Sequence, residues 1–137
     1  MKQYQFSLER KPRGFHIVTR EILSHLGELP ASGLLHLFIQ HTSAGICINE
    51  NADPSVLHDM NMWFDKNIQE EEPYYLHTYE GTDDMPAHIK SVLTGNSLTI
   101  PIKNHELALG TWQGIYLCEF RNMAYGRKLI ATIQGFE

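Results

Sequence analysis

The chain has 137 residues and a formal net charge of −5 at pH 7, with a pI near 5.9. A nucleic-acid-binding protein needs a basic face for its phosphate contacts, so this charge argues against that class and favours a small-molecule partner. The amino terminus lacks the apolar core of a signal peptide and no apolar run could span a bilayer, so we expect a soluble, cytoplasmic protein that binds no membrane.

No linker, low-complexity run or internal repeat divides the chain, and residues 1–137 are therefore expected to form a single domain. The two cysteines, Cys47 and Cys118, each lie within an apolar stretch. Without a secretory signal they are better interpreted as small buried hydrophobic residues than as a disulfide, and this pattern argues against a catalytic cysteine.

The first forty residues predict three strands and one helix. Alternation of polar and apolar side chains predicts a strand over residues 2–8, and a short apolar run predicts another over residues 15–18. An apolar stripe after the capping residue Thr19 predicts a helix to about residue 29. The apolar residues 33–40 predict the third strand.

Polar groups gather where the next strand begins. His41, Thr42 and Ser43 precede an apolar run over residues 44–49 that contains β-branched side chains, which predicts a buried strand. The connection over residues 49–52 is rich in side chains that bond the local backbone. This connection forms either a turn held by local side-chain hydrogen bonds or one wall of a functional site.

Two helices are predicted in the middle of the chain. Asp53 and Pro54 are typical of an N-cap and the first helical position, and the apolar pattern that follows places Trp63 and Phe64 in the core. A pair of aspartates ahead of a later proline predicts another helix, which ends at Thr94 because a glycine follows.

The remainder of the chain predicts three strands. They cover residues 97–102, 109–120 and 127–134, and a polar turn over residues 103–106 joins the first two. The order of strands and helices contains no repeated βαβ unit. It therefore indicates an α+β fold with mostly antiparallel sheets.

The strand around residues 111–121 is apolar on both faces, so we expect it to be buried on both sides. It carries Glu119 and Arg121, and buried charges need an ionic partner, a metal or a bound anion. Arg121 and Arg127 stand at the two ends of a loop and could clamp a phosphate. The alternative is an ion pair between Arg121 and Glu119, with Arg127 exposed.

Three histidines have polar neighbourhoods: His41 at a strand end, His77 in a loop and His88 near a helix start. Three protein ligands with a free position are the plan of catalytic zinc sites. The nearby carboxylates of Asp83, Asp84 and Glu119 could orient the rings or hold a harder cation. The spacing matches no compact ligand motif, so ordinary core or surface histidines are the alternative. Thr42 and Ser43 are interpreted as donors to an anion rather than nucleophiles, because no G-x-S-x-G elbow surrounds them.

Three blocks of the chain resemble one family in order and spacing. They read HTSAGICINENADPSVLHDM, HTYEGTDDMPAHIKSVLTGNSLTIPI and LALGTWQGIYLCEFR, and the similarity runs from PRGFHIVT at Pro12 to IATIQG at Ile130. They resemble the YjbQ-like family, whose members carry the name secondary thiamine-phosphate synthase. The resemblance implies a compact α+β domain with a β-sandwich-like core and two or three helices, assembled as a homotrimer with sites near the subunit boundaries.

The resemblance also implies a set of polar site positions and an activity. The positions that match the family's motifs are His41, Thr42, Ser43, His77, Glu80, Gly81, Asp83, Asp84, His88, Trp112, Gln113, Glu119 and Arg121. The implied activity joins a hydroxymethylpyrimidine diphosphate to a thiazole phosphate and releases pyrophosphate. Such a step needs a divalent cation and basic side chains that stabilise the departing diphosphate.

We assign provisional roles on this basis. The ligands of a divalent metal, zinc or magnesium, are predicted to be His41, His77 and His88. The predicted catalytic residues are His41, Asp83, Glu119 and Arg121. The predicted contacts to the phosphorylated substrate are Thr42, Ser43, Gln113, Arg121 and Arg127.

Two other functions fit the same residues. A metal with phosphate-binding side chains would also suit a metal-dependent hydrolase of a small phosphorylated metabolite. A non-catalytic, trimeric ligand-binding protein would use the charged groups as ion pairs between subunits.

Overall fold

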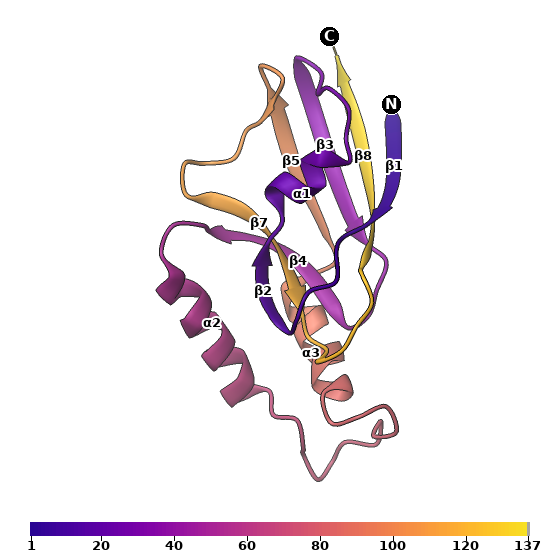
Figure 1. Ribbon diagram of the computed structural model, residues 1–137, viewed down its shortest axis with the longest axis vertical. Helices are drawn as coiled ribbons and strands as arrows, with labels where there is room; N and C mark the ends of the chain where they lie inside the picture. The colour runs from indigo at the N-terminus through magenta and orange to yellow at the C-terminus, as the bar shows by residue number, and fades with distance from the viewer. Residues whose placement is uncertain (137) are drawn as a thin grey trace.

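The computed structural model describes residues 1–136 and contains eight strands and three helices within them (Figure 1). In chain order the elements are β1 (Lys2–Ser7), β2 (Gly14–Ile17), α1 (Thr19–Ser24), β3 (Ser32–Ile39), β4 (Ala44–Glu50), α2 (Pro54–Asn67), α3 (Asp84–Thr94), β5 (Ser97–Lys103), β6 (Glu106–Leu107), β7 (Gln113–Glu119) and β8 (Lys128–Phe136). None of the helices in this part of the chain is long and apolar enough to cross a membrane.

Two antiparallel sheets form the body of the molecule. The larger has the strand order β1-β8-β3-β5-β6 and the smaller has the order β2-β7-β4. Figure 1 shows α2 and α3 beside the smaller sheet, at the end of the molecule away from the chain termini. The predicted α+β architecture with mostly antiparallel sheets is therefore confirmed.

The main core lies between the two sheets and follows from period-two alternation. Leu35, Leu37 and Ile39 point inward from β3, where they meet Ile115 and Leu117 of β7. The opposite face of β7 packs into a second apolar cluster beneath α2 and α3. The expectation that this strand is buried on both faces is confirmed.

The first helix is shorter than the sequence predicts. It ends at Ser24 rather than near residue 29, because contacts with β1 replace its next turn: His25 stacks on Phe6, and the Gly27 amide donates to the Tyr4 hydroxyl at 3.4 Å. The predicted cap is also wrong. Thr19 is the first helical residue, and its hydroxyl accepts a hydrogen bond from the Ile115 amide at 2.9 Å.

Two other elements differ from the prediction. Phe64 is 8% exposed, as expected, but Trp63 is 55% exposed, because neighbouring residues on a helix point about 100° apart and only one of them faces the core. The strand predicted from residue 109 begins at Gln113. A turn precedes it, in which the Gln113 amide donates to the Gly110 carbonyl at 3.1 Å.

Several local predictions are confirmed. The Asp53 carboxylate caps α2 by accepting from the Ser55 amide at 2.9 Å, with Pro54 at the first position. Asn104 and His105 both have positive φ angles and form the two-residue turn between β5 and β6. The sequence leaves the connection over residues 49–52 open between a turn and a wall of a site: β4 runs to Glu50, the Asn51 amide then donates to the Trp112 carbonyl at 2.8 Å, and Asn51 and Ala52 line a small cavity.

Helix α3 lies directly on β4, and this contact places the helix beside the polar loop before that strand. The Ser91 hydroxyl donates to the Ala44 carbonyl at 2.9 Å, and the Ile46 amide donates to the Gly95 carbonyl at 3.2 Å. Gly45 lies between these bonds, and a Cβ atom there would come within 2.8 Å of the Gly95 carbonyl oxygen. The absence of a side chain at Gly45 therefore allows the close approach.

Candidate metal-binding site

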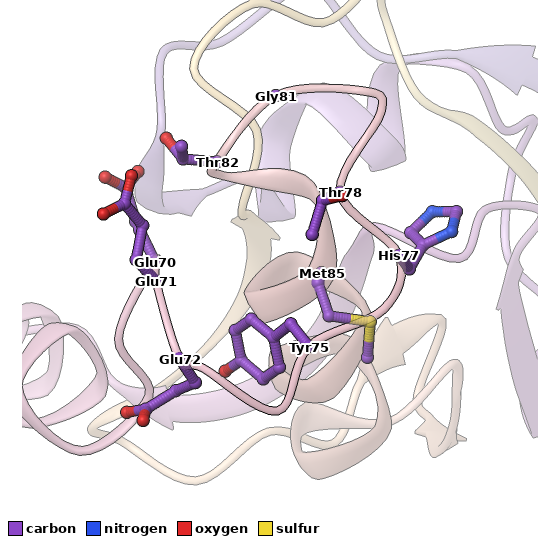
Figure 2. Close-up of a pocket in the computed structure, with 9 residues that line it drawn as sticks. All are labelled: Glu70, Glu71, Glu72, Tyr75, His77, Thr78, Gly81, Thr82 and Met85. Carbon is purple, nitrogen blue, oxygen red and sulfur yellow. The ribbon is translucent and has the colours of Figure 1, made fainter.

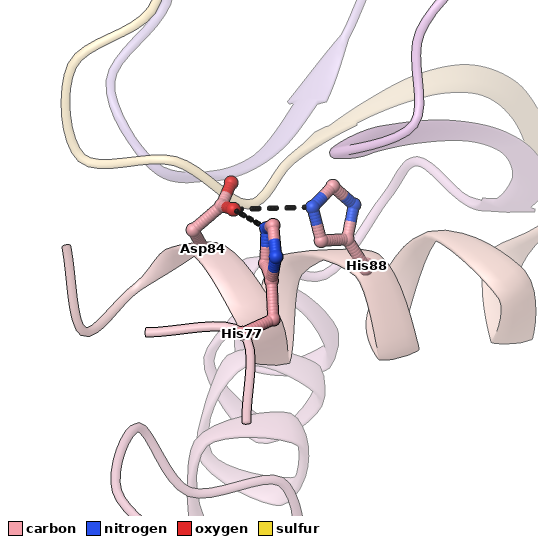
Figure 3. A group of neighbouring side chains, drawn as sticks. All are labelled: His77, Asp84 and His88. Atoms are coloured by element: carbon pink, nitrogen blue, oxygen red, sulfur yellow. Dashed lines mark hydrogen bonds and ion pairs between the residues drawn. The ribbon is translucent and has the colours of Figure 1, made fainter. Parts of the chain in front are cut away.

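His77, Asp84 and His88 form the most compact group of metal-ligating side chains among residues 1–136 (Figure 3). The Asp84 Oδ2 atom lies 2.8 Å from His77 Nε2 and 3.2 Å from His88 Nε2, and one ligand atom from each residue lies within 4.8 Å of the others. Asp84 and His88 share a face of α3 because they are four residues apart. His77 reaches them from the loop between α2 and α3.

The hydrogen bond on the far side of His88 determines which of its nitrogens faces the group. His88 Nδ1 lies 2.8 Å from the Thr42 carbonyl oxygen, which can only accept, so Nδ1 carries the proton. In the neutral ring, Nε2 then directs a lone pair at the Asp84 oxygen. Two acceptors repel at this distance unless a proton or a cation lies between them. A backbone-oriented imidazole of this kind is typical of metal ligands.

The second oxygen of Asp84 is held by Arg121. Arg121 Nη1 donates to Asp84 Oδ1 at 2.6 Å, Nε donates to Asp83 Oδ2 at 2.9 Å, and Nη2 donates to the Glu80 carbonyl at 2.9 Å. Burial would raise the pKa of Asp83, but hydrogen bonds from the Asn122 amide and from Arg121 bring that pKa below its ordinary value. Arg121 therefore fixes the carboxylate that faces the two histidines.

A buried ion pair supports the same region from the other side. Glu119 is 1% exposed and Arg127 is 6% exposed. Arg127 Nε donates to Glu119 Oε1 at 2.7 Å, and Nη2 donates both to Glu119 Oε2 and to the Ser43 carbonyl. The expected alternative pairing of Arg121 with Glu119 and an exposed Arg127 is wrong, because Arg127 takes this carboxylate and Arg121 takes the two aspartates.

His41 lies apart from the compact group. The Lys128 amide donates to His41 Nε2 at 2.8 Å, so this nitrogen is already occupied. Burial lowers the pKa of His41, and the positive charge of Arg127 lowers it further. The ring is therefore held in its neutral form, with Nε2 as an acceptor.

The other predicted residues divide into those near the group and those away from it. Thr42 and Ser43 contribute backbone carbonyls, to His88 and Arg127 respectively. Gln113 lies at the opposite end of β7 from Glu119, where its side chain accepts from the Gly110 amide at 2.7 Å. Asp84 is predicted only as one of the nearby carboxylates that could orient the rings or hold a cation, and not as a member of the three-ligand set. The signal that could have identified it is its four-residue spacing from His88 on one helix.

Two cavities border the group on different sides. One, of about 240 Å³, contains His77 in its wall, and Figure 2 shows the Tyr75 ring and the Met85 thioether between Glu72 and His77. Its lining residues are Glu70, Glu71, Glu72, Tyr75, His77, Thr78, Gly81, Thr82 and Met85. The other, of about 410 Å³, has no carboxylate side chain from residues 1–136 in its wall. It is lined by His41, Thr42, His88, Ser91, Val92, Gly95 and Asn96.

Comparison with known proteins confirms the family resemblance. The family profile described as UPF0047 protein YjbQ-like matches residues 4–136. The UPF0047 protein YjbQ of Escherichia coli O157:H7 is 49% identical over 135 residues, which is 97% of each chain. The UPF0047 protein YugU of Bacillus subtilis is 44% identical over 104 residues, which is 75% of this chain and 76% of its own.

A solved structure shows the same fold. The conserved hypothetical protein TT1486 from Thermus thermophilus superposes with a TM-score of 0.83 at 30% identity, covering 95% of this chain and 98% of that one. The names of these similar proteins state no activity. The chemistry of this chain therefore has to be inferred from its own side chains.

The structural role of Arg127 can be separated from phosphate binding. We expect Arg127→Ala to lower the free energy of unfolding by about 3–5 kcal/mol, because it leaves Glu119 buried without its partner. Urea denaturation followed by circular dichroism measures this. Arg13→Ala is the control: its pairs with Asp65 and Glu70 are partly exposed, so its loss should be below about 1 kcal/mol. Equal losses in the two variants would favour the phosphate-binding role.

The environment of His41 predicts a dependence of stability on pH. Because the pKa of His41 is lowered in the folded state from 6.5, the unfolded chain binds this proton more readily. Stability should therefore fall as the pH drops below 6.5, until the folded ring also protonates. We expect the unfolding free energy of the wild type to decline more steeply over this range than that of His41→Gln. Parallel curves from urea denaturation would contradict the lowered pKa.

Proposed function

We propose that this protein, which belongs to the UPF0047 YjbQ-like family, is a metal-dependent enzyme whose cation is held by His77, Asp84 and His88. The observation that carries the proposal is the orientation of His88. Its Nδ1–H donates to the Thr42 carbonyl, so in the neutral ring the lone pair of Nε2 faces the Asp84 carboxylate. A cation between these atoms turns a repulsive contact into two attractive ones.

The donor set favours zinc over magnesium. Imidazole nitrogens suit zinc, whereas magnesium prefers an all-oxygen shell. Asp84 is buried, while His77 is half exposed and His88 is partly exposed, so the group is open on the side of the histidines. Three protein ligands with an open side match the plan of a catalytic rather than a structural zinc site. When bound, such a cation supplies Lewis-acid activation of a phosphoryl oxygen.

The surrounding residues favour hydrolysis over the synthase reaction. Release of a diphosphate needs free basic side chains, but Arg121 and Arg127 are both engaged by carboxylates. The cavity beside His77 is lined by three glutamates, which would repel a second polyanion. We therefore infer that the reaction is hydrolysis of a small phosphorylated metabolite, and that thiamine-phosphate synthesis, implied by the resemblance, is the alternative.

We assign the phosphate to the cavity beside His88. Its wall contains the Thr42 hydroxyl, the Asn96 amide and the His41 imidazole, and no carboxylate from the described part of the chain. Arg121 has a positioning role here, because it holds Asp84 through the oxygen that does not face the histidines. The homotrimer and the cytoplasmic location stay predictions.

Metal content tests the ligand set directly. We expect near-stoichiometric zinc in wild-type protein purified without chelator, and a loss of at least about tenfold in His77→Ala, Asp84→Asn and His88→Ala. Inductively coupled plasma mass spectrometry measures the metal per chain. His58→Ala is the matched control, because His58 is an exposed histidine on α2 whose side chain bonds to Asp59, outside the group.

The same experiment decides the role of His41. Because the Lys128 amide occupies its Nε2, His41→Ala should retain the metal. Loss of metal in this variant would return His41 to the ligand set. A wild-type protein that takes up neither zinc, manganese nor magnesium would contradict the enzyme proposal and favour the non-catalytic ligand-binding protein.

Product analysis separates the two reactions. We expect the zinc-loaded protein to release inorganic phosphate from members of a panel of small phosphomonoesters. The rate of phosphate release should be lower by about tenfold or more in Asp84→Asn and in chelator-treated protein. A parallel assay supplies hydroxymethylpyrimidine diphosphate with thiazole phosphate. Formation of thiamine phosphate and pyrophosphate without phosphomonoester cleavage would replace the hydrolase with the synthase.

A further inference from the structure

The two cysteines of the chain lie on neighbouring strands of the smaller sheet. Cys47 of β4 stands opposite Tyr116, and Cys118 of β7 stands opposite Gly45, so the two side chains are diagonal neighbours on the same face. Their Sγ atoms are 3.5 Å apart and share a thiol hydrogen bond. Both thiols are free. Neither residue belongs to the candidate metal group.

The two thiols have different environments. Cys118 is fully buried in the apolar cluster beneath α2 and α3, whereas Cys47 is partly exposed at the margin of that cluster. The hydrogen bond from Cys118 lowers the pKa of Cys47, although burial opposes this. The same bond raises the pKa of Cys118, and burial raises it further. Cys47 is therefore the thiol that an oxidant reaches, and the one more readily ionised.

We propose that Cys47 and Cys118 are a redox-active pair that closes a reversible intrachain disulfide on exposure to hydrogen peroxide. The inference rests on the separation of the sulfurs and on the unequal exposure of the two side chains. It does not depend on the proposed enzymatic activity, because the metal ligands are not involved.

The reaction proceeds in two steps. The Cys47 thiolate attacks one oxygen of the peroxide, the O–O bond breaks, and the departing hydroxide takes a proton, which leaves a sulfenic acid on Cys47. The Cys118 sulfur then attacks the Cys47 sulfur, the S–O bond breaks, and water leaves with the Cys118 proton. Overall, two thiols lose two electrons and two protons, and one peroxide becomes two waters.

The diagonal placement explains why the disulfide should be reversible. The sulfurs must close from 3.5 Å to a bond length of about 2.05 Å, while the seven-residue register between β4 and β7 resists movement of either strand. Diagonal partners in a sheet are typically about 7–8 Å apart at Cα, which exceeds the usual span of a disulfide, so closing the bond requires a small shift of the backbone. A bond formed under these constraints is strained, and strained disulfides are the ones that cellular dithiols reduce readily.

The test uses the purified full chain, freed of metal by chelation, and hydrogen peroxide as the probe. We expect wild-type protein to lose both titratable thiols, to decrease in intact mass by about 2 Da, and to give one cross-linked peptide that joins β4 to β7 after non-reducing digestion. Dithiothreitol should restore both thiols. A disulfide that resists this reduction would overturn its reversibility.

Two matched variants make the roles of the cysteines separable. In Cys118→Ser, Cys47 should gain oxygen, about 16 Da or more, because no second thiol can displace it. In Cys47→Ser, the buried Cys118 should keep its thiol. Oxygen addition to wild-type Cys47 without cross-linking, a disulfide between two chains, or thiols that survive conditions that oxidise Cys118→Ser would each overturn the proposal.

Discussion

The buried ion pair between Glu119 and Arg127 holds together the segments on which the candidate site depends. Arg127 stands just before β8, Glu119 ends β7, and the pair's third contact is the Ser43 carbonyl in the loop before β4. The neighbouring Thr42 carbonyl fixes the ring of His88. A buried charge without its partner is costly, so these three chain segments are kept in one arrangement.

A second set of charges continues this support into α3. The Glu119 carboxylate also accepts from the Arg121 amide at 3.1 Å, and the Arg121 side chain holds Asp83 and Asp84. The two carboxylates and the buried pair thus share one connected network. Both arginines are therefore engaged by carboxylates, and this supports the proposal of a metal site over diphosphate binding through arginine.

Sequence reasoning succeeded where the signal was local. The cap at Asp53, the polar turn over residues 103–106 and the double burial of β7 each depend on neighbouring residues, and each was predicted. It failed where two residues competed for one environment. Trp63 and Phe64 are both large aromatic residues, and the way the helix packs on the sheet, which the sequence pattern does not contain, decides which of them is buried.

For the candidate site, too, local features could be predicted from the sequence, whereas long-range contacts could not. His77 and His88 could be selected as candidates because polar residues surround them in the sequence. The partners of the charged residues are set by contacts distant in sequence, since Arg121 lies 38 residues from Asp83. The sequence contains 16 aspartate and glutamate residues, and it does not specify which of them each arginine contacts. His41 has the same difficulty, because the amide that occupies its ring lies 87 residues away on β8.

The cysteine pair and the candidate metal site are chemically separate but mechanically adjacent. Cys118 stands opposite Gly45, and the preceding Ala44 carbonyl is bound by Ser91 of α3, one turn beyond His88. Closing the disulfide requires β4 to shift toward β7. Gly45 of β4 packs so closely against the end of α3 that a shift of this strand is expected to move the helix as well. We therefore expect oxidation of the cysteines to displace α3, which carries Asp84 and His88. On the two proposals together, we expect the affinity for the metal to differ between the reduced and the oxidised protein.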